Sequence, residues 1–251
     1  MIRGIYASAT GMVAETARTD TIANNIANAN TAGYKRDVAV NKDFASMLIW
    51  RINDGESNPS VGSLVGTQVD EIATDHAQAG MRLTGDPYNL ALQGSGYFTI
   101  QTENGPRYTR DGTFTLNAQG QLVTMTGRLV LGEGGPIHID PRTPSNKVTI
   151  DPTGRVLADQ KEVGKLQLVA FADEKQLVKQ GDNLFNADNA VGGAQNFTGR
   201  VAQGYLEESN SNMVLNMVNL IATYRAYELN AKVIQSHDSL LGRAVNDVGK
   251  V

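Results

Sequence analysis

Small and apolar residues recur in alternating steps of four and three at both ends of this 251-residue sequence, and this pattern constrains the fold most. Because the spacing places the members of each stripe on one face of a helix, it predicts a long amphipathic helix at each end. The N-terminal stripe consists of Ile5, Ala9, Met12, Thr16, Thr19, Ala23 and Ile26. The C-terminal stripe consists of Met213, Met217, Leu220, Tyr224, Tyr227, Ala231 and Ile234.

Each terminal helix needs a partner, because an isolated amphipathic helix gains most of its stability from packing. We therefore expect the two helices to pair with each other as a coiled-coil-like unit made of residues 1–36 and 206–251. Ser209 or Ser211 would cap the second helix at its start, and Gly242 would lie near its end.

The middle of the chain carries a different pattern, made of short β-branched runs separated by turns. Runs such as residues 97–102 and 121–126 predict antiparallel strands, so residues 81–205 are expected to form a central β-rich domain. The loop-rich segment INDGESNPSVGSLVG favours an extended connector over residues 37–80. The predicted fold class is α+β, with long terminal helices and a central antiparallel β domain.

Two segments of the middle region share one turn pattern, namely FTLNAQGQLV from Phe114 and VTIDPTGRVL from Val148. In each, β-forming residues lead into Asn117 or Asp151, and a glycine follows three residues later. This order suits a type I turn that an Asx side chain opens and a residue of positive φ closes. It predicts two hairpins. The recurrence of the same pattern from Phe114 and from Val148 could also indicate an internal repeat, although two copies are too few to establish a repeat array.

Charge and hydropathy exclude several classes of protein. The net charge of −4 provides no basic field for a phosphate backbone, so we expect no nucleic-acid partner. We expect no membrane insertion, because no apolar run is long enough to span a bilayer. The absence of cysteine excludes disulfides and zinc–thiolate sites.

We expect no catalytic residue, metal site or cofactor. His76, His138 and His237 fall in three separate segments, without a second histidine at metal-ligand spacing. A glycan hydrolase would need two carboxylates in a cleft, and the sequence suggests no such pair. Glu207 and Glu208 precede the predicted C-terminal helix, where we expect them to favour the helix dipole and solubility.

Asparagines are concentrated in both terminal segments, although they are poor helix formers. The stretch TIANNIANANTAGYKR contains Asn24, Asn25, Asn28 and Asn30. A second stripe on the C-terminal helix consists of Asn212, Asn216, Asn219, Thr223, Ala226 and Asn230. These amides either form a solvated surface or are buried in an assembly, where amides satisfy each other without the desolvation cost of charge. We predict the second, a lateral interface between subunits.

Several segments resemble the bacterial flagellar basal-body rod and hook family, closest to its smaller proximal and distal rod proteins. They are IYASATGMVAE, IANNIANANTAGYKR, DPYNLALQGSGYFTI, RYTRDGTFTLNAQGQLVT and YLEESNSNMVLNMVNLIATYRAYELNAKVIQ. The resemblance covers nearly the whole chain, and the short length favours rod over hook.

The resemblance implies a structural subunit of the rod in the basal body, spanning the cell envelope. Such a subunit would have no enzymatic activity. It would leave the cell through the flagellar type III export apparatus, polymerise helically through its terminal helices and transmit torque from motor to hook. Its partners would be copies of itself and neighbouring rod or hook proteins. The family motifs match Asn24, Asn25, Asn28, Asn30, Thr31, Gly33, Tyr34 and Lys35, and Ser209, Asn210, Met217, Arg225, Ala226, Tyr227 and Lys232.

Together with Asn216 and Asn219 of the amide stripe, the motif residues give the predicted assembly interface. It consists of Asn24, Asn25, Asn28, Asn30, Gly33, Tyr34, Ser209, Asn210, Asn216, Met217, Asn219, Arg225, Tyr227 and Lys232. The alternative function is a secreted β-domain binding module whose helices serve only for oligomerisation. Symmetry separates the two, because a repeating heterologous contact builds an open tube, whereas a module closes into a small oligomer.

Overall fold

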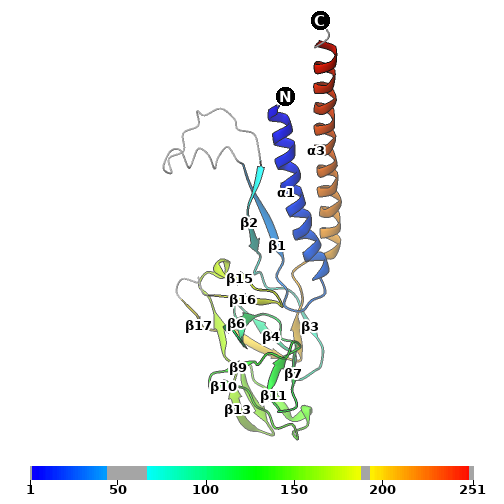
Figure 1. The fold of residues 1–251 in the computed structure, drawn as a ribbon. Helices are drawn as coiled ribbons and strands as arrows, with labels where there is room; N and C mark the ends of the chain where they lie inside the picture. The colour runs from blue at the N-terminus through cyan, green and yellow to red at the C-terminus, as the bar shows by residue number, and fades with distance from the viewer. Residues whose placement is uncertain (1, 44–66, 188–192, 249–251) are drawn as a thin grey trace. The chain divides into compact units, whose positions relative to one another are not determined.

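The computed structural model describes residues 2–43, 67–187 and 193–248, which form two units (Figure 1). The helical unit contains residues 2–27, the described part of 37–75, and residues 212–248. The β unit contains residues 28–36 and the described part of 76–211. Two long helices and a central antiparallel β region confirm the predicted α+β class.

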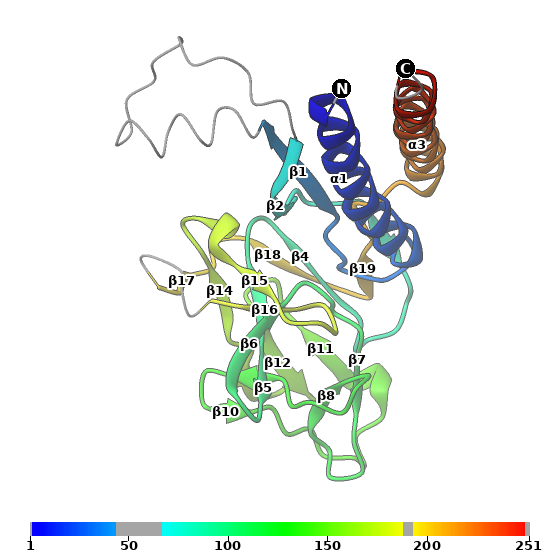
Figure 2. The ribbon, with the colours of Figure 1, turned by 45° about the horizontal axis from the view of Figure 1, so that its top comes forward.

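The helical unit is built on α1 (Ile2–Ala27) and α3 (Met213–Val248), which lie side by side with opposite directions (Figures 1 and 2). Glycines of α1 permit the close approach. A Cβ at Gly11 would lie 3.1 Å from Nδ2 of Asn230, and a Cβ at Gly4 would lie 2.8 Å from Nε2 of His237. The residue number rises along α1 from Gly4 to Gly11 while that of the contacted residue falls along α3 from His237 to Asn230, so the two helices are antiparallel.

The ends of α3 differ from the prediction. Asn212 is the N-cap, since its Oδ1 accepts a hydrogen bond from the backbone N–H of Leu215 at 3.0 Å, so the expectation for Ser209 or Ser211 was wrong. Gly242 lies inside the helix rather than at its end.

A two-stranded antiparallel hairpin completes the helical unit. It consists of β1 (Asp37–Asp43) and β2 (Thr67–Thr74), with a bulge between Val40 and Asn41. Both strands pack against α1. Residues 37–80 were expected to form an extended connector, whereas their described part contains these two strands. The segment INDGESNPSVGSLVG lies outside the described residues.

The β unit consists of short antiparallel strands and two single-turn 3₁₀ helices. Its first strands are β3 (Met81–Leu83), β4 (Leu90–Gln93), β5 (Tyr97–Thr102), β6 (Gly105–Thr109), β7 (Phe114–Leu116), β8 (Leu122–Thr124), β9 (Leu131–Gly132) and β10 (Gly135–Pro136). They are followed by η1 (Ser145–Lys147), β11 (Val148–Ile150), β12 (Arg155–Ala158), β13 (Lys161–Lys165) and β14 (Leu168–Ala170). The last elements are η2 (Glu174–Gln176), β15 (Val178–Lys179), β16 (Leu184–Asn186), β17 (Gln195–Asn196), β18 (Arg200–Gln203) and β19 (Tyr205–Glu207).

The largest sheet has six strands in the order β15-β16-β6-β5-β14-β17, and β11, β12 and β13 form a second sheet. Side chains alternate across β5, so Phe98 and Ile100 enter one apolar core and Tyr97 enters another. Both faces of β5 are therefore buried, which explains why this strand is a continuous run of β-forming residues.

The two predicted hairpins are confirmed. In the β7–β8 hairpin, Oδ1 of Asn117 accepts from the backbone N–H of Gln119 and of Gln121. In the β11–β12 hairpin, Asp151 makes the same contacts with Thr153 and Arg155. The closing glycines have positive φ, +77° at Gly120 and +85° at Gly154.

Candidate assembly surface

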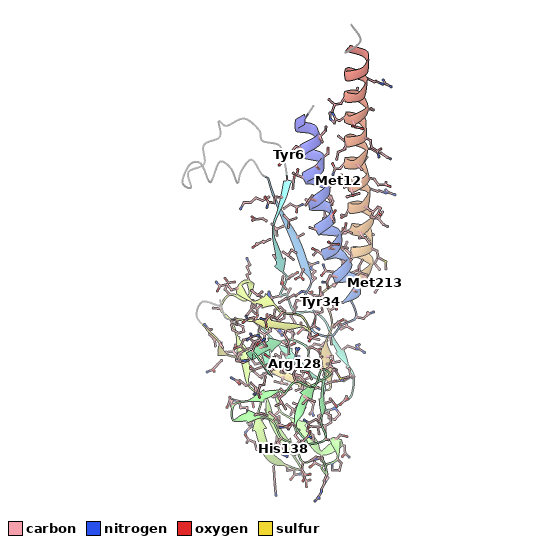
Figure 3. The ribbon with its side chains drawn as sticks, viewed as in Figure 1. Tyr6, Met12, Tyr34, Arg128, His138 and Met213 are labelled. Carbon is pink, nitrogen blue, oxygen red and sulfur yellow. The ribbon has the colours of Figure 1, made fainter. Side chains whose placement is uncertain are left out.

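The first half of α3 exposes apolar side chains over most of its outer surface. Val214 is 72% exposed and Ile221 is 56% exposed, and between residues 213 and 224 there is no charged residue. Met213 lies in the first turn of α3 (Figure 3). The exposed members are Met213, Val214, Leu215, Met217, Val218, Ile221 and Tyr224. A contiguous exposed apolar surface of this kind is typical of a protein interface.

The face of α3 that meets α1 carries several polar side chains instead. Asn216 and Thr223 are buried, and the Asn230 side chain lies against Gly11 of α1. Over residues 213–224 the outer face of this helix is therefore apolar and most of its inner face is polar, the reverse of a helix on the surface of a globular protein. The prediction placed the apolar seam against the first helix and the amides outside. The structure shows the opposite orientation for Met213, Met217, Tyr224 and Tyr227, which are exposed, whereas Leu220, Ala231 and Ile234 of the predicted seam are half-buried.

Asn25 holds the hairpin of the helical unit against α1. Its Nδ2 donates to the backbone carbonyl of Asp37 at 2.7 Å, and its Oδ1 accepts from the Asp37 N–H at 2.9 Å. The amide thus makes the pair of hydrogen bonds that a neighbouring strand would supply. This buried side chain explains one asparagine of the N-terminal stretch by a contact within the chain.

The other predicted interface residues of the helical unit have mixed exposure. Asn24, Met217, Arg225, Tyr227 and Lys232 are exposed, Asn219 is half-buried and Asn216 is buried. The structure therefore places part of this set on the outside, where a second subunit could reach it, and part between elements of one chain.

The remaining predicted residues lie in the β unit, where the two motif segments meet. Asn28 is half-buried and Asn30 is exposed. The Gly33 N–H donates to the carbonyl of Glu207 at 2.8 Å, and the Asn210 N–H donates to the carbonyl of Tyr34 at 3.3 Å.

Two further contacts involve the second motif segment. The Arg36 N–H donates to Oδ1 of Asn210 at 2.7 Å. Ser209 Oγ accepts from the Ser211 N–H at 3.2 Å. The bonds of Gly33, Tyr34 and Arg36 to residues 207–210 fix the segment before β1 to the segment before α3 within the β unit, and the Ser209–Ser211 bond shapes the second segment locally.

A buried cluster of charges lies where these segments meet. Nζ of Lys35 is 2.6 Å from Oε1 of Glu207, and Nη1 of Arg110 is 3.2 Å from Oε2 of the same carboxylate. All three residues are at most 2% exposed. Lys35 also donates to the carbonyl of Ala77, and Arg110 donates to the carbonyl of Gly94. These hydrogen bonds offset the large cost of removing the charges from water.

Electrostatics in this cluster follows from burial. Loss of solvent lowers the pKa of the Lys35 ammonium below its ordinary value, and the Glu207 carboxylate opposes that shift. Burial likewise raises the pKa of the Glu174 carboxyl, and Arg110 opposes that rise. Because Lys35, Arg110 and Glu207 are closed to solvent, we assign this cluster a structural role.

Sequence reasoning missed the roles of Glu207 and Arg110. The expectation that Glu207 caps a helix and solubilises the chain was wrong, whereas Glu208 is exposed and lies 3.7 Å from Arg82. The pairing of Glu207 with Lys35 joins positions 172 apart, and no local pattern reports such a contact. In the structure Leu206 and Glu207 of β19 are both buried, which places this carboxylate inside the β unit.

Residues 2–43, 67–187 and 193–248 lack two kinds of feature. In that part of the chain, neither long helix has a stretch apolar enough to cross a membrane. Among the same residues, no three histidines or carboxylates gather in a way that could hold a metal ion.

Three family models match this chain. The model described as "Flagella basal body rod protein" matches residues 5–35. "Flagellar hook protein FlgE/F/G D1 domain" matches residues 91–158, and "Flagellar basal body rod FlgEFG protein C-terminal" matches residues 202–247. The matched regions include both helices and part of the β unit.

Individual relatives are similar over most of their length. The flagellar basal-body rod protein FlgF of Caulobacter vibrioides is 39% identical over 234 residues, covering 92% of each chain. The rod protein FlgG of Buchnera aphidicola is 34% identical over 96% of this chain and 98% of its own. The flagellar hook-basal body complex protein FlhO of Bacillus subtilis is 30% identical over the full length of both chains. This chain belongs to the family of flagellar basal-body rod proteins.

Proposed function

We propose that this protein is a structural subunit of the flagellar rod in the bacterial basal body. In this function it polymerises helically through its terminal helices and transmits torque from motor to hook. The observation that carries the proposal is the inverted orientation of α3, with amides inside and apolar side chains outside.

The apolar surface of α3 favours association strongly. Full burial of one Val, Ile or Met side chain stabilises by about 1.5–3 kcal/mol, and seven large side chains are exposed over residues 213–224. A single chain leaves this surface in water, whereas a polymer covers it. Because the surface belongs to one side of an elongated helix pair, a repeated heterologous contact would build an open helical assembly.

We propose that α1 and α3 form a coiled-coil-like pair within each subunit. Gly4 and Gly11 are seven residues apart on α1 and meet His237 and Asn230, also seven residues apart on α3. This heptad spacing supports the proposal. The predicted division into a terminal helical part, a connector and a central β domain also stays a proposal.

The proposed partners are further copies of the chain and neighbouring rod or hook proteins. The proposed route out of the cell is the flagellar type III export apparatus, and we propose no catalytic activity. Asn24, Asn30, Met217, Asn219, Arg225, Tyr227 and Lys232 remain proposed members of the interface, supported by their full or partial exposure.

Substitutions on the outer face of α3 test the proposal. Val214→Lys or Ile221→Lys would introduce a charge into the covered apolar surface, so we expect loss of motility and of tagged protein from isolated basal bodies. Met125→Lys is the matched control, because Met125 is also 72% exposed but lies in the β unit. Secreted protein in the medium would show that export is intact.

The outcome separates the two functions. Normal incorporation of both α3 variants would contradict polymerisation through this face. A small closed oligomer of the purified wild-type chain, absent from basal bodies, would instead favour the secreted binding module.

A further inference from the structure

We propose that an exposed stripe of α1 packs against an exposed stripe of α3 in the next copy, with Asp20 facing Arg225 across the contact. This inference rests on the proposed function, because it names the two surfaces that meet when the chain polymerises.

The stripe on α1 is separate from the face that meets α3 of the same chain. It recurs in steps of three and four, and all its members are exposed, Tyr6 by 65% and Val13 by 71%. Its members are Tyr6, Ala9, Val13, Thr16, Asp20, Ala23 and Ala27. The Thr16 hydroxyl donates to the carbonyl of Met12 at 2.9 Å, so its polar group is already satisfied. Asp20 is the sole charge among these seven described positions.

The stripe on α3 lies on the flank of the outer face. All its members are exposed, with Val218 and Leu229 at 58% and 63%. They are Val218, Ala222, Arg225, Leu229, Val233, Ser236 and Leu240. The steps are again three or four, and Arg225 is the sole charge of this described set. Each stripe therefore has seven positions and one charge, of opposite sign.

The direction of the contact follows from the fold. Subunits of a helical polymer share one direction along its axis, and α1 and α3 are antiparallel within a chain. The helix α1 of one copy and α3 of the next therefore also run antiparallel.

In an antiparallel arrangement, setting Asp20 opposite Arg225 pairs the other six positions of the two stripes to within one residue. Ala23 meets Ala222, Ala27 meets Val218 and Thr16 meets Leu229. Towards the other end, Val13 meets Val233, Ala9 meets Ser236 and Tyr6 meets Leu240. At two positions a smaller residue of α1 lies opposite a larger residue of α3, namely Ala27 with Val218 and Thr16 with Leu229, which permits close packing.

The charges need this partner. Within the described residues, neither Asp20 nor Arg225 takes part in an ion pair. Covering either apolar stripe would leave a buried unpaired charge unless an opposite charge lay across the contact. Placing Asp20 opposite Arg225 gives each charge a partner of opposite sign in the same contact.

A charge exchange tests the contact. Asp20→Arg alone and Arg225→Asp alone would each place like charges together, so we expect about tenfold less tagged protein in basal bodies. The double variant D20R/R225D should restore incorporation and motility. The double variant D20R/K232D carries the same charges but places the acid two turns away on α3, so it should not restore them. Export into the medium controls for folding and secretion.

Disulfide cross-linking gives an independent measurement, because the chain contains no cysteine. Oxidation of basal bodies that contain D20C/R225C should give covalent dimers and longer multimers of the chain, whereas D20C/K232C should not. Failure of both the charge exchange and the cross-link, with wild-type chain present in basal bodies, would overturn this contact and leave the proposed function standing. Absence of the wild-type chain from basal bodies would overturn both.

Discussion

Lys35 and Glu207 form a buried ion pair, with Nζ 2.6 Å from Oε1, although they lie 172 positions apart in the chain. Lys35 belongs to the segment that follows α1, and Glu207 ends β19 shortly before α3. The pair therefore fixes two segments, one next to each terminal helix, to each other inside the β unit. Arg110 binds the other carboxylate oxygen and completes the cluster.

Replacing Lys35 should destabilise the β unit. Lys35→Met would remove the hydrogen bonds to the Glu207 carboxylate and to the carbonyl of Ala77, while Arg110 would still pair with Glu207, so we expect a loss of about 1–3 kcal/mol from the unsatisfied buried acceptors. Lys147→Met is the control, because Lys147 pairs with Asp159 on the surface and should change stability by less than about 1 kcal/mol. Urea unfolding of both purified variants measures the difference. Equal stabilities would show that the buried pair contributes no more than a surface pair.

Asp111 should make stability depend on pH in a defined direction. Burial raises the pKa of its carboxyl, and Oδ1 accepts from the Thr113 N–H, a bond that Asn can keep. At low pH the group is protonated in both states and has no effect. As the pH rises through the unfolded value of about 3.9 and then the folded pKa, the buried charge increasingly destabilises the folded state.

The Asp111→Asn variant lacks this titration. We therefore expect the stability of the wild type, relative to the variant, to fall as the pH rises from about 3.5 and to level off above the folded pKa. Urea unfolding of both proteins over this range measures the difference, in which the other carboxylates cancel. A relative stability that rises with pH would contradict the predicted sign.

Three glycines of the β unit should resist substitution, for two reasons. Gly120→Val and Gly154→Val would force a β-branched residue into positive φ, at a cost of roughly 1–3 kcal/mol each. Gly112→Val would destabilise through overlap of its Cβ with the carbonyl oxygen of Leu90. At Gly134 the Cβ would meet open space, so Gly134→Val is a near-neutral control. Thermal unfolding that does not separate the first three from the control would contradict this account.

The parts of the fold that depend on neighbours in sequence could be predicted. The Asn117 and Asp151 turns are local, because the side chain, the backbone groups it binds and the closing glycine lie within four residues. The strand at residues 97–102 was also recognisable from its continuous β-forming run. Contacts between distant segments, such as Lys35 with Glu207, left no comparable pattern.

The prediction of which face of α3 packs against α1 was wrong for a different reason. A periodic apolar stripe such as Met213, Met217 and Tyr224 normally identifies the face that packs inside the same chain. In this protein the amide side packs inside, and the apolar side is left for another surface. The sequence shows both stripes, but it does not say whether a stripe is covered by its own chain or by another.

Adjacent asparagines of α1 should behave differently, which separates folding from assembly. Asn25 is buried and makes two hydrogen bonds with the backbone of Asp37, whereas Asn24 is exposed. In Asn25→Ser, one short hydroxyl cannot reach both backbone groups, so we expect a loss of roughly 1–3 kcal/mol in the hairpin contact and reduced incorporation into basal bodies. In Asn24→Ser, a small hydroxyl keeps a donor and an acceptor, so incorporation should stay near normal.

Charge at Asn24 tests the interface itself. Asn24→Asp should leave export and the stability of the β unit unchanged but lower incorporation, because an unpaired carboxylate would become buried between subunits. The measurements are motility and the amount of tagged protein in isolated basal bodies, with protein in the medium as the export control. Normal incorporation of Asn24→Asp would assign Asn24 to a solvated surface. Equal incorporation of the two serine variants would show that the bonds to Asp37 do not distinguish Asn25, and loss of export would mean that the secretion apparatus reads this segment.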